Sequence, residues 1–185
     1  MKVTETELEG VLLVEPHVFS DTRGHFLEAY QETRYAEAGI HGPFVQDNLV
    51  KSERHVLRGL HLQNPHGQGK LVQALEGEIF DAAVDVRWGS PTFGKWFGAI
   101  LTAADHRQIY VPPEFAHGYV VVSYGALVSY KTTDFYTPEA ELAVAWDDPE
   151  IAIDWPIANP VLSERDAAAP RLSEIPQARL PGYPA

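Results

Sequence analysis

The chain has 185 residues, of which 26 are acidic and 14 are basic, and its formal net charge at pH 7 is −12. This acidic balance argues against nucleic acid and anionic membrane surfaces as partners, because both attract basic proteins. The absence of cysteine excludes disulfide bonds, thiolate catalysis and cysteine-bound metals. No segment approaches the roughly 20 apolar residues of a membrane span, and the polar opening MKVTETELEG is unlike a signal peptide. We therefore expect residues 1–185 to form one soluble, cytoplasmic domain.

Short β-strands dominate the predicted secondary structure. Residues 1–30 are predicted as an extended lead-in with a strand at Val11–Val14 and a turn at Arg23-Gly24. One short helix is expected over Gln31–Ala38, with Gly39 ending it. The further strands, separated by turn sequences, are predicted at Phe44–Val50, Val56–Gln63, Leu71–Leu75, Glu78–Arg87, Lys95–Leu101, Gln108–Val111, Gly118–Ser123, Leu127–Asp134 and Leu142–Trp146.

Glycine and proline, 14 of each, punctuate these segments. Many short strands at this spacing are typical of a β-sandwich or barrel. From residue 147 onward prolines are frequent, so residues 147–185 are expected to form a tail that wraps the barrel, with one helical turn near Ser163–Ala168. The predicted fold class is therefore all-β, a cupin or jelly-roll β-sandwich barrel with a few short helices and a proline-rich C-terminal tail.

The stretch from Phe44 to Lys70 differs in charge from the rest of the chain. It contains four basic and two acidic residues, a formal charge of +2 within a protein of −12. A local cationic region in an acidic protein indicates a site for an anion. Amide, carboxylate, guanidinium, imidazole and ammonium groups all occur in this stretch, a mixture that packing alone would rarely need.

Within this stretch, strict alternation along the predicted strand places Arg58 and His61 on opposite faces. A bulge at Gly59 would bring both side chains to one side, and the sequence leaves this choice open. A lone histidine is more often a packed residue with a satisfied hydrogen bond than a functional one. The presence of Lys70 soon after it, and of His117 later, favours a functional role for His61.

Metal-binding cupins carry an H-x-H motif with a later acidic residue, and a P-x-G-x-x-H motif. Here the first motif reads His61-Leu62-Gln63, so its second histidine is missing, and in the second Glu114 stands in the glycine place before His117. Transition metals need about three or four ligands at fixed geometry. Two histidines without a clear third ligand predict that no metal is bound, and they favour His61 as a proton carrier.

Two residues outside the cationic stretch are candidate partners of His61. Tyr130 lies on a predicted strand, and a phenol facing an imidazole across a barrel could exchange protons with opposite faces of a substrate. A tyrosine in a strand is nevertheless more often a packing residue. Asp166, in LSERDAAAP, would fix the tautomer of His61 and raise its basicity, whereas an acid in a tail is more often a solvated charge or a helix cap.

These segments together resemble the dTDP-4-dehydrorhamnose 3,5-epimerase family, cupin-fold enzymes of dTDP-L-rhamnose synthesis. The similar stretches follow the family's order from about residue 19 to 172, and they read DTRGHFLEAY, FVQDN, VLRGLHLQ, GQGKLVQALEGEIFDAAVDVR, GSPTFGKW, YVPPEFAHGY, SYKTTDFY and WDDPEIAIDWP. The resemblance implies epimerisation at C3 and C5 of dTDP-4-dehydro-6-deoxy-D-glucose, giving dTDP-4-dehydro-L-rhamnose. It also implies a homodimer that exchanges N-terminal strands within residues 1–30, and no metal or organic cofactor.

Carried over motif by motif, the resemblance implies His61 as catalytic base and Tyr130 as catalytic acid. Asp166 would pair with the base, and Lys70 would lie near the keto oxygen of the substrate. The sugar and nucleotide would be bound by Arg23, Glu28, Gln46, Asp47, Asn48, Arg58, His117, Glu141 and Arg165. Two positions depart from the family pattern: Glu114 replaces a glycine, and Arg165 replaces a lysine with a planar fork rather than a point charge.

Three other interpretations remain open. The chain could be a single-centre epimerase that inverts only C3 or only C5 of the same substrate, because such relatives share most of these motifs. It could be a non-catalytic cupin that binds a sugar nucleotide, although a binding module needs no acid–base pair. It could be a metal-dependent cupin, against which Gln63 counts. The sequence also does not choose between Phe19 and Tyr136 as the aromatic residue that stacks on thymine.

Overall fold

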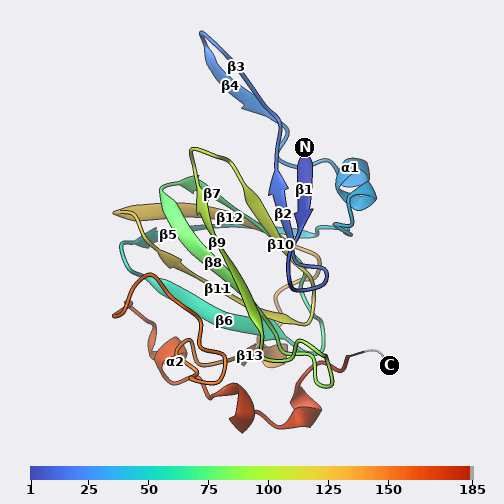
Figure 1. Ribbon diagram of the computed structural model, residues 1–185, viewed down its shortest axis with the longest axis vertical. Coiled ribbons are helices and arrows are strands. Elements are labelled where there is room, and N and C mark those ends of the chain that lie inside the picture. The colour runs from blue at the N-terminus through green and yellow to red at the C-terminus, as the bar shows by residue number, and fades with distance from the viewer. Residues whose placement is uncertain (184–185) are drawn as a thin grey trace.

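The computed structural model describes residues 1–183, and nearly all of its regular structure is β (Figure 1). A six-stranded sheet has the order β1-β2-β10-β7-β12-β5, a five-stranded sheet has the order β13-β6-β11-β8-β9, and β3 pairs with β4 alone. This antiparallel sandwich confirms the predicted all-β jelly roll. The strands are β1 Lys2–Glu5, β2 Leu12–Glu15, β3 Val18–Asp21, β4 Gly24–Leu27, β5 Gln46–Glu53, β6 Leu57–Gln63, β7 Lys70–Glu76, β8 Glu78–Asp85, β9 Trp96–Thr102, β10 Gln108–Val111, β11 Phe115–Val121, β12 Gly125–Thr132 and β13 Glu141–Ala143.

The main core lies between the two sheets. Val72 and Val128 enter it from the six-stranded sheet, Ile79 and Val121 enter it from the five-stranded sheet, and all four are fully buried. Successive side chains of a strand point to opposite faces, so the sheets also need apolar cover on the outside. The outer face of the six-stranded sheet is covered near β2 and β10 by the segment around Tyr35.

Both predicted helical segments are confirmed. Helix α1 spans Glu32–Glu37, where the side chain of Gln31 accepts a hydrogen bond from a backbone N–H of the first turn. Gly39, with φ +88°, takes the left-handed conformation that ends many helices. Helix α2 spans Glu164–Ala167, and Ser163 caps it through Oγ. The short 3-10 turns are η1 Pro138–Ala140, η2 Leu172–Glu174 and η3 Gln177–Arg179.

Strand β6 contains the bulge on which the placement of Arg58 and His61 depends. His117 of β11 is opposite His61, whereas Tyr119 is opposite Arg58, so three steps along β6 match two steps along β11. Gly59 lies within this irregularity at φ +123°, and a Cβ there would come within 2.6 Å of the Gly118 Cα. The bulge therefore requires glycine, and it resolves the choice that the sequence left open by bringing Arg58 and His61 to the same side.

Residues beyond 147 run along the outside of the five-stranded sheet, drawn in orange and red beside β6 and β13 in Figure 1. Leu172, Ile175 and Leu180 pack there against Leu60 and Leu62 of β6, and form the second apolar cluster. This packing covers the outer face of the sheet and fixes the position of helix α2 relative to β6.

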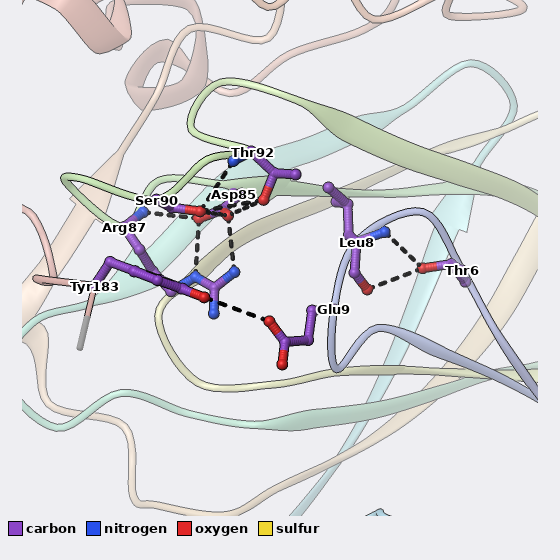
Figure 2. Close-up of polar contacts among 8 residues, drawn as sticks. All are labelled: Thr6, Leu8, Glu9, Asp85, Arg87, Ser90, Thr92 and Tyr183. Carbon is purple, nitrogen blue, oxygen red and sulfur yellow. Dashed lines mark hydrogen bonds and ion pairs between the residues drawn. The ribbon is translucent and has the colours of Figure 1, made fainter. Parts of the chain in front are cut away.

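A polar cluster around Arg87 binds the C-terminal segment to the barrel at Tyr183 (Figure 2). The guanidinium of Arg87 donates two hydrogen bonds to the buried carboxylate of Asp85, at 3.0 and 2.8 Å. It also lies 4.4 Å from the centroid of the Phe115 ring and 4.9 Å from that of the Tyr183 ring. Because a cation is attracted to aromatic faces, Arg87 holds Tyr183 against the barrel, and the Tyr183 hydroxyl reaches Glu9 at 3.5 Å.

One strand was not predicted, and several predicted bounds were wrong: β5 extends to Glu53 rather than Val50, and β13 ends at Ala143 rather than Trp146. Strand β1 was not predicted, because its sequence KVTE is short and polar. Strand β11 begins at Phe115 rather than Gly118, so His117 lies inside a strand instead of in the loop before it. The run from Phe115 to Val121 is buried on both faces, and such strands carry no alternating pattern.

Candidate active site

A cavity of about 310 Å³ opens between the sheets near the second half of β6. It is bounded by β6 and β11 of one sheet, by β12 of the other, and by helix α2 and the loop after β12. Its lining residues are Val50, Arg58, His61, Leu62, Gln63, Gln68, Lys70, His117, Tyr119, Tyr130, Tyr136, Glu141, Ser163, Arg165 and Asp166. Eight of the thirteen predicted site residues are therefore gathered here: His61, Tyr130, Asp166, Lys70, Arg58, His117, Glu141 and Arg165.

An imidazole–carboxylate pair joins strand β6 to helix α2. Nε2 of His61 lies 2.6 Å from Oδ1 of Asp166, although the two residues are 105 positions apart in the sequence. Burial alone raises the pKa of the Asp166 carboxyl, but hydrogen bonds from His61 and Ser163 and the charge of His61 lower it further than burial raises it. Asp166 is therefore an ionised partner that orients the ring of His61.

A second imidazole–carboxylate pair lies beside the cavity, which its histidine, His117, lines. Nε2 of His117 lies 2.9 Å from both carboxylate oxygens of Asp81, which is fully buried on β8. Lys70, on β7, is also buried, and burial lowers the pKa of its ammonium group to about 8, although Asp81 and Glu141 act in the opposite direction. Asp81 was not predicted as a site residue.

Tyr130 lies on the wall opposite His61. His61 belongs to β6 of the five-stranded sheet, and Tyr130 belongs to β12 of the six-stranded sheet, where it is paired with Asn48 of β5. Both side chains line the same cavity. Burial raises the pKa of the Tyr130 phenol, and the positive charge of Arg58 partly offsets this effect. The phenol is therefore protonated at neutral pH.

Three side chains meet at the mouth of the cavity. The hydroxyl of Tyr136 donates to Oε2 of Glu141 at 2.6 Å, and Nη1 of Arg165 donates to the same oxygen at 2.7 Å. Burial raises the pKa of the Glu141 carboxyl, but these two hydrogen bonds, together with the charges of His61 and Arg165, more than compensate, and the net pKa is lowered. The contacts link helix α2 to the loop after β12.

Five predicted site residues do not line the cavity of this single chain. Arg23, at the tip of the β3–β4 hairpin, forms an ion pair with Asp21 at 2.5 Å, and Glu28 pairs with Arg34. This hairpin projects away from the body of the molecule (Figure 1). The other three are neighbours on the edge strand β5: Gln46, Asp47 and Asn48.

Several lining residues escaped the sequence analysis. Tyr119 follows His117 by two positions on β11, so period-2 alternation would have placed both on one face once the strand was correctly bounded. Tyr136 was considered only as an alternative to Phe19, which lies on the projecting hairpin and not in this cavity. Gln68 carried no signal that distinguishes it from a surface residue.

Residues 1–183 contain no cluster of three or more His, Cys, Asp or Glu side chains placed to hold a metal ion. No helix in the same range is long and apolar enough to cross a membrane. Gln63, at the place of the second histidine of the metal-binding motif, uses its side-chain amide to bind the backbone of neighbouring loops.

The fold and this cavity define the class of small jelly-roll proteins with an acid–base site between their sheets. Residues 5–174 match the family model described as dTDP-4-dehydrorhamnose 3,5-epimerase. The dTDP-4-dehydrorhamnose 3,5-epimerase of Pseudomonas aeruginosa is 53% identical over 168 residues, covering 90% of this chain and 93% of that protein. The chain belongs to the dTDP-4-dehydrorhamnose 3,5-epimerase family.

Two further comparisons bear on substrate and specificity. A solved structure of dTDP-6-deoxy-D-glucose-3,5-epimerase from Legionella pneumophila, in complex with dTDP-4-keto-L-rhamnose, superposes with a TM-score of 0.96 at 48% identity and covers 100% of this chain and 99% of that one. The dTDP-4-dehydrorhamnose 3-epimerase of Streptomyces niveus is 40% identical over 182 residues, 97% of this chain and 88% of that protein.

Proposed function

We propose that this chain catalyses the epimerisation of dTDP-4-dehydro-6-deoxy-D-glucose at C3 and C5, giving dTDP-4-dehydro-L-rhamnose, a step of dTDP-L-rhamnose biosynthesis. One observation carries the proposal: a paired imidazole and a protonated phenol face one cavity from opposite sheets. Inversion of a carbon next to a ketone needs a base on one face and an acid on the other. The similarity to 3,5-epimerases over nearly the whole chain supplies the substrate.

His61 takes the proton from C3, and the electron pair of the broken C–H bond moves into an enolate whose negative charge lies on the C4 oxygen. Lys70 stabilises this oxygen as an ammonium group, which a preorganised buried donor does well. Asp166 holds the His61 ring and balances the charge that it gains. The negative charge of Asp166 therefore favours the enolate state over the ketone.

Tyr130 then donates its phenolic proton to C3 from the opposite face, which inverts the centre and leaves a phenolate. The phenolate takes up a proton, and His61 loses one to solvent, so both groups return to their starting states. The same cycle at C5 completes the reaction with no net gain or loss of atoms. Because the arriving proton is not the departing one, each inverted carbon carries a solvent-derived hydrogen.

The charged part of the nucleotide is bound at the rim. Arg58 lines the cavity, and its Nε donates to Oγ of Ser52 at 3.0 Å, which holds the side chain in place. Guanidinium forks suit phosphate oxygens, so Arg58 and Arg165 are the proposed ligands of the diphosphate. Tyr136, half-exposed at the mouth, is the proposed stacking partner of thymine.

Two of the remaining predicted contacts, Arg23 and Glu28, are proposed to come from a second copy of the chain. The β3–β4 hairpin carries Arg23 and exposes Phe19 and Phe26, which are 58% and 69% accessible. An apolar arm that projects from the body favours an interface with another molecule. The proposed homodimer, with a mass of twice 20.5 kDa, places Arg23 and Glu28 of one copy at the cavity of the other, and light scattering measures that mass directly.

The decisive experiment is the reaction in deuterium oxide, followed by proton NMR of the product. We expect deuterium at both C3 and C5 and the L-rhamno configuration. The similarity to the Streptomyces niveus 3-epimerase supports one alternative, inversion of a single centre. Deuterium and inversion at C3 alone would establish that alternative, and binding of dTDP without any exchange would leave only a binding protein.

A further inference from the structure

Gln63 makes a set of contacts that the proposed chemistry does not use. It ends strand β6 two positions after His61, is only 3% accessible, and lines the cavity. Its amide nitrogen donates to the backbone carbonyl of His66 at 2.8 Å and to that of Phe135 at 3.2 Å. Its carbonyl oxygen accepts from the backbone N–H of Thr137 at 2.8 Å. Both amide hydrogens are thus donated to protein, which orients the side chain fully.

Two of these contacts bracket a single residue. Phe135 and Thr137 are the immediate neighbours of Tyr136, so the amide of Gln63 binds the chain on both sides of it. A backbone carbonyl and a backbone N–H two residues apart are the groups that an adjacent β-strand would engage. The side chain of Gln63 therefore fixes the backbone around Tyr136 through the same two groups that an adjacent strand would bond.

Packing covers only about half of Tyr136, because the residue is 51% accessible. Besides the bracket formed by Gln63, its backbone N–H donates to Gln46 at 3.2 Å and its hydroxyl donates to Glu141 at 2.6 Å. Hydrogen bonds thus determine where the ring lies. Removing one partner of such a bond leaves a buried polar group unsatisfied, which is unfavourable.

We propose that Gln63 is a positioning residue for nucleotide recognition, acting through Tyr136. Gln63, which stands in the place of a metal ligand in the H-x-H pattern, holds the ring of Tyr136 at the cavity mouth. In that orientation the ring contacts the base of a nucleoside diphosphate. The inference rests on the proposed function for the identity of the ligand. It assigns Gln63 no contact with the reacting carbons, so it predicts an effect on affinity rather than on turnover.

The test is Gln63→Met, which keeps the length of the side chain and removes all three hydrogen bonds. We expect the Kd for dTDP, measured by calorimetry, and the KM for the dTDP-sugar to rise about tenfold, as the loss of roughly 1.4 kcal/mol predicts. The value of kcat at saturating substrate should stay within about threefold. An unchanged Kd would overturn the proposal.

Gln108→Met is the matched control. Gln108 is 2% accessible and also makes three hydrogen bonds, with Tyr35, Ala29 and Gln73, but it lies outside the cavity. The two variants should lose similar stability in urea, while only Gln63→Met weakens dTDP binding. Equal weakening of dTDP binding in both would show a general loss of stability and contradict a positioning role.

A double-mutant cycle with Tyr136→Ala separates positioning from other roles. If Gln63 acts through the ring, adding Gln63→Met to Tyr136→Ala raises the Kd for dTDP no further, whereas additive effects overturn the proposal. Should Gln63→Met fail to fold, Gln63→Glu provides the same comparison, because a carboxylate keeps the contact with Thr137 and loses both donors. A wild-type protein that binds dTDP without epimerising would refute the proposed function and leave this test intact.

Discussion

The two imidazole–carboxylate pairs of the cavity look alike in chemistry and differ in placement. His61 and His117 are register partners on the neighbouring strands β6 and β11. The His61 side chain is 30% accessible and its carboxylate partner comes from the C-terminal segment, whereas the His117 side chain is 9% accessible and pairs with Asp81 inside the sheet. The first pair is therefore the better placed of the two to face a substrate and to exchange its proton with solvent.

This difference in accessibility gives the two pairs of one small cavity different roles. A base must lose the proton that it has taken before the next turnover, and a partly accessible ring does this readily. A ring enclosed among strands and held by both oxygens of a carboxylate is suited instead to keep a fixed hydrogen-bond direction. Substitutions at the two pairs should therefore separate a proton carrier from a fixed contact.

The largest effect is expected from His61→Ala. Removing a general base typically lowers the rate by 10²–10⁴-fold, so we expect kcat and solvent deuterium exchange to fall by about 10³. His117→Ala should lower kcat by only about tenfold and raise KM, because it removes a contact and not the base. Equal losses of solvent deuterium exchange in the two variants would contradict this division of roles and show that His117 also acts as a base.

A smaller effect is expected from replacing the carboxylates. Asp166→Asn should lower kcat about tenfold with little loss of stability, because His61 loses the negative charge that balances its proton. Asp81→Asn should cost about 1–3 kcal/mol in urea unfolding, since it disturbs a fully buried hydrogen-bonded pair. The reverse pattern, with Asp81→Asn affecting mainly kcat, would show that the enclosed pair takes part in proton transfer.

The pH dependence of activity and of stability should report on Lys70, a buried cavity residue that belongs to neither imidazole–carboxylate pair. Burial lowers the pKa of its ammonium group from 10.5 to about 8, so activity should fall about tenfold per pH unit above pH 8 as the ammonium is lost. Stability should move in the opposite direction. Between about pH 8 and 10.5 the unfolded chain binds more protons than the folded one, so the free energy of unfolding rises with pH.

Both trends can be measured on one sample series. Initial rates from pH 7 to 9.5 give the alkaline limb, and urea unfolding at the same pH values gives the stability. Activity and stability falling together would show that unfolding, rather than deprotonation of Lys70, limits the enzyme at high pH.

The smallest effect is expected at Glu114, just before the strand that carries His117. Glu114 has φ +74°, a conformation that costs a non-glycine residue about 1 kcal/mol. Glu114→Gly should therefore raise the melting temperature by about 2–4 °C, as measured by calorimetry, while kcat changes less than twofold. A lower melting temperature would show that the carboxylate makes a stabilising contact that outweighs the backbone strain.

Local features of the molecule followed from the sequence alone. Most of the short strands, the helix near Gln31–Ala38 ended by Gly39, and the helical turn near Ser163–Ala168 depend on residues close together in the chain, and these predictions are confirmed. The family was also recognisable from the order of its motifs, and the match over residues 5–174 confirms it. Periodicity failed at β11 because a strand buried on both faces shows no alternation.

The tertiary structure decided which groups meet, although the family resemblance had already implied that Asp166 pairs with His61. Asp166 pairs with His61 across 105 residues, His117 pairs with Asp81, and Gly59 turns Arg58 and His61 to the same side through a bulge. No local pattern encodes such pairings, because they depend on how distant strands are ordered within the sheets. For the same reason Arg23 and Glu28, assigned to the site by resemblance, lie on a projecting hairpin and its flank, away from the cavity of their own chain.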